Sequence, residues 1–303
     1  MDGMDELRTA LTGVVAITVT PFDDSGAFDQ DGYAAGVARL VDGGIGVVTP
    51  NGNTGEFYAL RPAECDRAVA VTCDVAGDRA VVLAGVGHDT ATAGAMALAA
   101  AKAGARAVMV HQPVHPYQSE RGWVDYHRAV ADAVPDTGVV CYVRHPVATP
   151  AALSALATSC PNVIGVKYAV PDVFALATAV AELGGRLTFS CGLAEMWAPF
   201  FWVAGARGFT SGLATVAPGL SLTMLGCLRA GDVAGAMRVW RLVRPLEELR
   251  ARHGAEHNVS VVKEALAQVG VCGAGVRPPI IGLEAADRAE VTRILRTWGV
   301  LPG

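Results

Sequence analysis

Residues 162–191 read NVIGVKYAVPDVFALATAVAELGGRLTFSC, and this stretch contains one full copy of the repeat on which the fold prediction rests. It opens with an apolar, β-branched run over 163–167, continues with helical spacing over 172–183, and returns to an apolar run over 187–191. Strands that are apolar throughout are typical of a parallel sheet covered on both faces, because parallel pairs need crossover connections. The stretch is therefore predicted to form a strand–helix–strand unit.

The same alternation extends along the chain from residue 13 to residue 230. Apolar strands are predicted over 13–20, 45–49, 80–86, 105–111, 138–143, 163–167, 187–191 and 207–210. Helices are predicted over 31–42, 62–75, 90–103, 120–133, 151–159, 172–183, 194–203 and 217–230. Eight such units are expected to close as an α/β protein of the (β/α)8 TIM-barrel class. An open doubly wound sheet is disfavoured, since residues 20–24 lack the glycine-rich fingerprint of its first turn.

After Gly231 the pattern changes to helices with no strand between them. These helices are predicted over 233–252, 259–269 and 285–298. We therefore expect two units, a barrel over 1–230 and a C-terminal three-helix extension over 231–303. No low-complexity linker separates them, so the extension is expected to pack on the barrel.

Composition and charge exclude several classes of protein. A hydrophobic fraction of 52% with only 17% charged residues excludes disorder. The net charge of −5 offers no basic field for nucleic acid or anionic lipid, so neither is an expected partner. No apolar run reaches the ~18 residues of a spanning helix, and the first twelve residues do not resemble a signal peptide, so a cytoplasmic location is expected. The seven cysteines include no CxxC pair and are interpreted as buried thiols.

Lys167 is the best candidate for a nucleophile. It ends an apolar strand, and the active site of a TIM barrel lies at the carboxyl ends of its strands. An ammonium group in apolar surroundings loses solvation and its pKa falls, so that the free amine can attack a carbonyl and form a Schiff base. Position alone does not exclude the alternative interpretation, in which the Lys167 amine reaches solvent or pairs with a carboxylate. The other two lysines, Lys102 and Lys263, are placed on a helix and on the extension, and neither competes.

Tyr142 ends the preceding predicted strand. Its phenol is expected beside the Lys167 amine if adjacent strands end at the same height, and a phenol can transfer a proton between substrate and water. An aromatic residue whose hydroxyl is merely hydrogen-bonded is the alternative interpretation.

The turn Gly52-Asn53-Thr54-Gly55 follows the second predicted strand. Its small residues allow backbone N–H groups to face an anion, with the Thr54 hydroxyl as a further donor, and such a site suits a carboxylate. The alternative is an ordinary glycine turn. No nucleotide-binding motif follows.

Histidines and cysteines near the strand ends suggest a competing hypothesis. His111 and His115 could form half of a metal site, which would make the barrel a metal-dependent hydrolase. No HxH pair ends the first strand, so histidines in loop hydrogen bonds are favoured and no metal is expected. Cys141 and Cys191 lack an evident base and are interpreted as inert core thiols.

The chain resembles the dihydrodipicolinate synthase / N-acetylneuraminate lyase superfamily over nearly its whole length. The motifs that carry the resemblance are Val19-Thr20-Pro21-Phe22 with Asp29, Gly52-Asn53-Thr54-Gly55-Glu56, Ala84-Gly85-Val86-Gly87, Tyr142, Gly165-Val166-Lys167, Cys191-Gly192, Gly205-Ala206-Arg207-Gly208 and Arg277-Pro278-Pro279.

This resemblance implies a metal-free, cofactor-free class I lyase that acts on a 2-oxo acid such as pyruvate. Lys167 would form an imine with the ketone, which then serves as an electron sink, and Tyr142 would transfer protons. Thr54 and neighbouring amides would bind the substrate carboxylate, while the backbone at Thr210 would close the pocket. A homo-oligomer, tetramer or dimer, is also implied. With the loop positions included, the predicted substrate-binding residues are Gly52, Asn53, Thr54, Thr210 and Ser211.

Departures from the synthase pattern bear on the substrate. Val147 stands where the synthases carry an arginine, Val114-His115 replaces their tyrosine pair, and Asn53 replaces a relay hydroxyl. True dihydrodipicolinate synthesis is therefore disfavoured.

Other segments look more like the branch containing 5-dehydro-4-deoxyglucarate dehydratase, which dehydrates and decarboxylates a sugar-derived 2-oxo acid. They are Gly55-Glu56-Phe57, Arg144, and residues 259–263 and 276–279. Lys167-Tyr168-Ala169 and Asn53 differ from that branch. Aldolase and dehydratase chemistry both stay open, as does a catalytically reduced barrel that only binds a 2-oxo acid, and Arg144, His115 and Ser211 are candidates for selecting the substrate's distal end.

Overall fold

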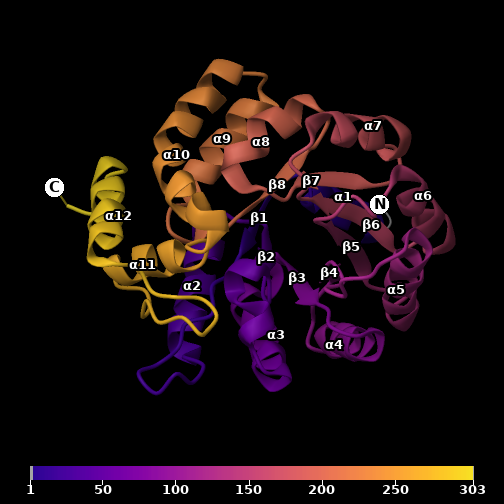
Figure 1. Ribbon diagram of the computed structural model, residues 1–303, viewed down its shortest axis with the longest axis horizontal. Coiled ribbons are helices and arrows are strands. Elements are labelled where there is room, and N and C mark those ends of the chain that lie inside the picture. The colour runs from indigo at the N-terminus through magenta and orange to yellow at the C-terminus, as the bar shows by residue number, and fades with distance from the viewer. Residues whose placement is uncertain (1–2, 303) are drawn as a thin grey trace.

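A computed structural model describes residues 3–302 (Figure 1). Within this range eight parallel strands pair in chain order and close into a barrel, which confirms the predicted fold class. The strands are β1 Val14–Ile17, β2 Val47–Thr49, β3 Val81–Val86, β4 Ala107–Val110, β5 Gly138–Val143, β6 Val163–Tyr168, β7 Thr188–Cys191 and β8 Gly208–Ser211.

Helices follow the strands and surround the barrel, as Figure 1 shows. They are α2 Gln30–Asp42, α3 Pro62–Ala76, α4 Thr90–Lys102, α5 Glu120–Ala133, α6 Pro150–Ser159, α7 Val173–Leu183, α8 Ala194–Val203 and α9 Pro218–Arg229. Many begin at a polar residue whose side chain accepts a hydrogen bond from a backbone N–H of the first turn, which satisfies a group that the helix leaves unpaired. Such caps are Asp29, Asp89, Ser119, Thr149 and Asp172.

The strands are buried on both faces. Because successive side chains point to opposite sides of a strand, Val15 and Ile17 fill the barrel interior, whereas Val14 and Ala16 pack toward the helices. This double burial explains why the strands read as continuous apolar runs.

Helix α1, Gly3–Ala10, was not predicted from the sequence. Its Leu7, together with Leu11, packs into the inner cluster with Met109 and Ile164, so the helix covers the barrel end opposite the carboxyl ends of the strands. Its short length and mostly polar composition leave no extended apolar pattern in the sequence.

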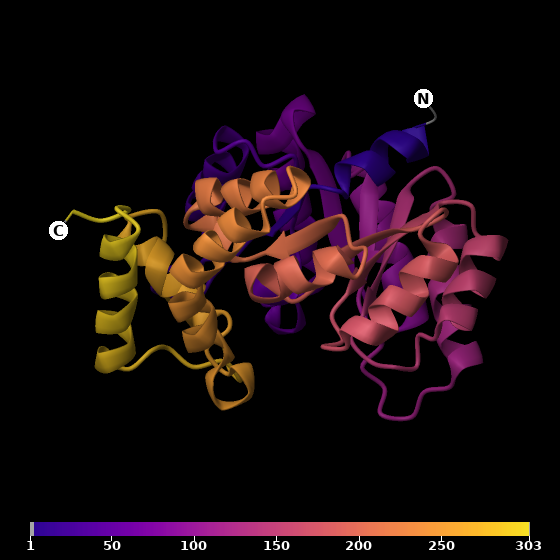
Figure 2. The same cartoon turned by 90° about the horizontal axis from the view of Figure 1, so that it is seen from above.

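The C-terminal extension consists of α10 Val233–Ala255, α11 Ser260–Gln268 and α12 Ala285–Thr297, close to the predicted bounds. Helix α10 packs against α8 and α9, and its backbone leaves helical geometry at Arg252, His253 and Gly254. Figure 2 shows these helices at one side of the barrel, away from α1. The predicted boundary at residue 230 falls between α9 and α10, while Met1, Asp2 and Gly303 of the two predicted units lie outside the described residues. No helix within 3–302 is both long and apolar enough to cross a bilayer.

Candidate active site

A cavity of about 450 Å³ opens at the carboxyl ends of the strands. Strand ends and βα loops contribute Asn53, Thr54, Tyr142, Lys167 and Thr210 to its wall. The extension completes the wall from the other side, with Glu247, Arg250 and Asn258 among its lining residues. The cavity therefore brings together most of the predicted site residues, and it adds residues that lie far from them in the sequence.

Lys167 and Tyr142 are direct partners across the β5–β6 pair. The Lys167 Nζ atom lies 4.0 Å from the centroid of the Tyr142 ring, and the lysine is only 5% exposed. Burial, assisted by the positive charge of Arg144, lowers the pKa of Lys167 to about 7. Among the ion pairs formed within residues 3–302, none includes Lys167. An amine that is buried, unpaired and often neutral favours the nucleophile interpretation over a solvated or ion-paired lysine.

The phenol of Tyr142 is held by Asn53. The Asn53 Nδ2 atom donates a hydrogen bond to the Tyr142 oxygen at 3.3 Å. Burial raises the pKa of Tyr142, and Arg144 and the Asn53 hydrogen bond partly oppose this shift. The phenol is therefore protonated at neutral pH and stands beside the amine, where it can give or receive a proton during reaction.

The turn after β2 is a short 3₁₀ helix, η1 Asn53–Gly55. Thr54 is 6% exposed and lines the cavity with Asn53. Gly52 is not a lining residue, but a Cβ atom at this position would lie 2.3 Å from Cγ2 of Ile17. Gly52 therefore shapes the turn by allowing close approach to β1, and Asn53 and Thr54 carry the contacts available to a ligand.

Thr210 and Ser211 end β8 and point to opposite sides. Thr210 lines the cavity and donates to the Cys191 carbonyl at 3.3 Å. Ser211 is fully buried on the helix side, where its hydroxyl donates to Oε1 of Glu195 at 2.6 Å. The alternation of side chains along a strand explains this difference. The expected role of Ser211 in substrate binding is thus corrected to a contact between β8 and α8.

A buried polar cluster behind the cavity was missed from the sequence. Glu195 also accepts from Ser221 of α9, and burial together with the charge of Glu247 raises the pKa of Glu195 to about 7. Glu247 in turn pairs with Arg250 at 2.7 Å, and both side chains are almost fully buried.

Arg250 also fixes the kinked end of α10. Its Nε and Nη2 atoms donate to the backbone and side-chain oxygens of Asn258, each at 3.1 Å. In the sequence, Glu247 and Arg250 form an i,i+3 pair on a highly charged helix, and this pattern is also typical of a solvated surface.

Arg144 lies on the loop after β5 at the exposed side of the cavity. Its guanidinium carbon is 6.0 Å from the centroid of the Tyr142 ring. No ion pair among residues 3–302 involves Arg144, so its charge is available to a ligand.

The two loop histidines occupy separate environments. His111 is buried, stacks on Phe57 with ring centroids 4.2 Å apart, and hydrogen-bonds to the Asn51 carbonyl. Burial lowers the pKa of His111 to about 3, so its ring is neutral. His115 is exposed and bonds to the backbone of Tyr117. Within residues 3–302, no group of three or more His, Cys, Asp or Glu side chains is arranged to hold a metal ion.

A buried lysine beside a phenol at the carboxyl ends of a (β/α)8 barrel is an arrangement suited to a Schiff-base lyase. The model of the dihydrodipicolinate synthetase family matches residues 10–298, and the chain belongs to this family.

Curated relatives and solved structures agree with this assignment. The chain is 33% identical over 292 residues to a probable 5-dehydro-4-deoxyglucarate dehydratase of Methylobacterium radiotolerans, covering 95% of each chain. A protein of the same name from Rhodococcus opacus is 32% identical over 94% of each chain. The structure of dihydrodipicolinate synthase from Bacillus clausii is 39% identical, with a TM-score of 0.93 over 97% of this chain and 99% of that one. The structure of the synthase from Oceanobacillus iheyensis is 35% identical, with a TM-score of 0.94 over 98% of this chain and 100% of that one. The protein is a lyase of this class.

Proposed function

We propose that this protein dehydrates a 2-oxo sugar acid that carries two carboxylates, with 5-dehydro-4-deoxyglucarate as the candidate substrate, through an imine formed on Lys167. The observation that carries the proposal is the buried amine of Lys167, with its pKa lowered to about 7, 4.0 Å from the Tyr142 ring centroid. The name of the curated relatives supports the choice of substrate.

The chemistry follows from the structure of such a substrate. The neutral amine adds to the ketone, and loss of water from the adduct gives an imine. The imine draws electrons from the adjacent methylene group, which loses a proton and leaves an enamine. The enamine then expels the hydroxyl group on the next carbon, which takes up a proton and departs as water. Because the candidate substrate also loses CO₂, the conjugated iminium next takes up the electron pair of the bond to the distal carboxylate, which leaves as CO₂. The resulting dienamine takes up a proton at carbon and its enol becomes an aldehyde. Hydrolysis of the imine then restores the lysine and releases the product.

Three residues that line the cavity suit parts of this chemistry. Tyr142 is placed to move the proton at the carbon next to the imine, since its phenol neighbours the lysine. Thr54 and Asn53 line the wall where the carboxylate beside the ketone would bind. The phenol, held by Asn53, would then face the reacting carbons.

Charge in the cavity supports a second carboxylate on the substrate. The Arg250 guanidinium is already paired with Glu247, whereas the charge of Arg144 is not compensated by an ion pair within residues 3–302. We assign Arg144 to the distal carboxylate, because a guanidinium binds a carboxylate with paired hydrogen bonds.

Aldol chemistry with pyruvate is the second candidate, because the two solved synthases are 39% and 35% identical to this chain. The position at which the synthases carry an arginine is occupied by the apolar Val147, which disfavours their second substrate. A barrel that binds a 2-oxo acid without turnover is the third.

Two measurements distinguish these candidates. The purified protein is first incubated with 5-dehydro-4-deoxyglucarate while substrate loss and CO₂ release are followed, and then with pyruvate and a panel of aldehydes. Turnover of the sugar acid supports the dehydratase, and turnover only with aldehydes supports the aldolase.

Borohydride reduction with pyruvate is expected to add mass to the peptide that contains Lys167. Lys102→Ala on the exposed end of α4 is the matched control and is expected to label like the wild type. Ligand binding without labelling of Lys167 would contradict the proposal.

We also propose that the protein works as a homo-oligomer, dimer or tetramer, in the cytoplasm. Membership of this enzyme family supports both the oligomer and the location. Light scattering coupled to size exclusion tests the assembly, and fractionation of the source cells tests the location.

A further inference from the structure

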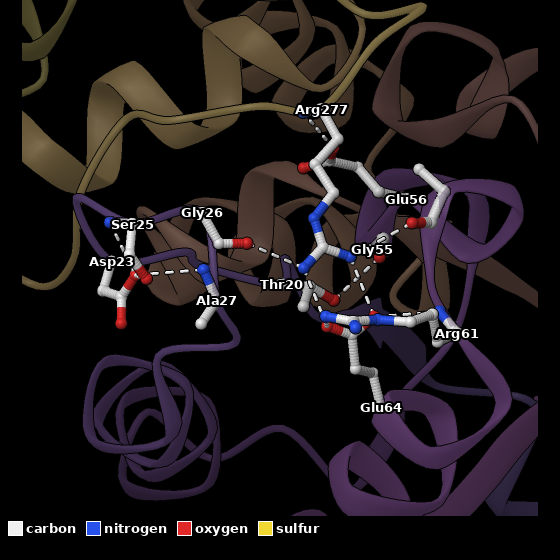
Figure 3. A network of polar contacts seen from close by, with 11 residues as sticks. Thr20, Asp23, Ser25, Gly26, Ala27, Gly55, Glu56, Arg61, Glu64 and Arg277 are labelled. Carbon is white, nitrogen blue, oxygen red and sulfur yellow. Dashed lines mark hydrogen bonds and ion pairs between the residues drawn. The ribbon is translucent and has the colours of Figure 1, made fainter.

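Both carboxylate oxygens of Glu56 are bound by the C-terminal extension. The Lys263 amine, on α11, donates to Oε1, and the backbone N–H of Arg277 donates to Oε2 at 3.0 Å. Figure 3 shows Arg277 lying between Glu56 and Glu64. The side chains of Glu56 and Lys263 are each 0% exposed, although the two residues are 207 positions apart.

Glu56 lies at the end of the turn that carries the substrate-facing residues. Its backbone is left-handed, with φ of +61°, a conformation that non-glycine residues rarely adopt. Its N–H donates to the carbonyl of Asn53 at 3.0 Å, which closes η1. The preceding residue, Gly55, is held from the other side by the Thr20 hydroxyl at 2.7 Å. The turn therefore has two anchors, one from the barrel and one from the extension.

Further contacts hold the C-terminal extension against the barrel next to Glu56. The Arg277 guanidinium binds both oxygens of Glu64 at 2.8 and 2.7 Å and lies 4.0 Å from the centroid of the Phe22 ring. Lys263 also donates to the carbonyl of Gly275. Removing one charge of a buried pair leaves the other uncompensated, so this anchor is sensitive to substitution of either partner.

We infer that Glu56 and Lys263 form a positioning pair that holds the Asn53–Thr54 turn in the orientation needed to bind the carboxylate beside the substrate ketone. Neither residue lines the cavity, so the pair acts through the turn. This inference rests on the proposed function. It means that the C-terminal extension sets the affinity of the barrel for 2-oxo acids from outside the catalytic centre.

The test separates a ligand with the carboxylate from one without it. Glu56→Gln and Lys263→Met are compared with the wild type by borohydride trapping with pyruvate and with acetone, a ketone that lacks the carboxylate. In both variants the half-saturating pyruvate concentration is expected to rise on the order of 10- to 100-fold, because a small displacement of positioning groups has effects of this size. Trapping with acetone is expected to change less than about two-fold, since the Lys167 amine is untouched.

A double variant keeps the test independent of stability. Glu56→Gln with Lys263→Met leaves no uncompensated charge, so its thermal stability is expected to recover toward that of the wild type. Its weak pyruvate binding is expected to persist. Arg106→Gln breaks an exposed pair with Glu6 and is the control for a change of charge alone.

Results of two kinds would overturn the inference. One is equal loss of pyruvate and acetone trapping, or loss of folding in all three variants, either of which would make the pair purely structural. The other is wild-type affinity for pyruvate in the folded double variant. Failure of the wild type to trap either ketone would instead contradict the proposed function, so the two failures are distinguishable.

Discussion

The Nζ atom of Lys167 lies 4.0 Å from the centroid of the Tyr142 ring, and the two residues pair directly across β5 and β6. Strand register places them at the same height, so their proximity does not depend on a flexible loop. The proposed nucleophile and the proposed proton carrier therefore stand on rigid elements, which keeps their mutual geometry fixed.

Replacing Lys167 with methionine is expected to abolish turnover and trapping and to increase stability at neutral pH. The folded-state pKa of about 7 is below the value of 10.5 for a free lysine, so burial of this amine opposes folding. Between these two pH values the unfolded chain binds more protons than the folded chain, and wild-type stability rises with pH. The stabilisation by methionine, on the order of a few kcal/mol at pH 6, is expected to shrink toward pH 10. Melting curves of both proteins across this range would show it, and a constant difference would contradict the lowered pKa.

The pH dependence of kcat/KM is expected to show an acid limb near pH 7. Below the Lys167 pKa of about 7 the amine is protonated and cannot attack the ketone, so the rate falls as pH decreases. Burial raises the pKa of Tyr142, so the phenol stays protonated through pH 10 and no basic limb is expected below that value. A flat profile between pH 6 and 8 would disagree with the assigned nucleophile.

Tyr142→Phe is expected to slow turnover by ~10²–10⁴-fold while trapping with pyruvate survives. The phenyl ring keeps the packing beside Lys167, and only the proton-transferring hydroxyl is lost. Rapid-quench measurement of imine formation, alongside steady-state turnover, separates the two effects. Loss of trapping would show that the phenol is needed to form the imine itself.

Arg144→Gln is expected to raise KM for the dicarboxylate roughly 10- to 100-fold, the loss produced by removing a hydrogen-bonded charge. Pyruvate has no distal carboxylate, so its binding should change little. Because Arg144 also contributes to lowering the Lys167 pKa, the acid limb of the pH profile is expected to move to higher pH. Titrations with both ligands test the assignment, and equal weakening of the two would refute a distal contact.

Ser211→Ala is expected to destabilise the protein without changing KM. The hydroxyl donates to the buried carboxyl of Glu195, and its loss leaves that group short of a partner, at a cost of about 1–3 kcal/mol. Chemical denaturation would measure the loss of stability, and steady-state kinetics would show the unchanged KM. An altered KM at unchanged stability would return Ser211 to the substrate site.

The local pattern of the sequence was sufficient to predict the barrel. Apolar runs and helical periods each depend on neighbouring residues, so the predicted element bounds differ from the structure by a few residues at most. Helix α1 escaped because its amphipathic period spans only eight residues.

The positions of Lys167 and Tyr142 at the cavity were predictable because a strand end fixes both position and direction. The alternation of side chains also places Ser211 on the side opposite Thr210, and this was overlooked at a strand end where the loop begins.

Long-range partners could not be predicted. Lys263 was placed correctly on the extension, yet its burial against Glu56 depends on how the extension docks, which no local pattern encodes. The same holds for Arg250 and Asn258, which lie on either side of the kink at residues 252–254 and line the cavity only because the extension docks there.

The separation of Glu56 and Lys263 by 207 positions has a consequence for how the protein is made. At typical rates of translation the ribosome needs roughly 10–40 s to add the intervening residues. During the later part of that interval the nascent chain already contains Lys167, while the Asn53–Thr54 turn still lacks its anchor on the extension. On the role inferred for this pair, the emerging chain acquires its full affinity for small keto acids only as synthesis nears its end.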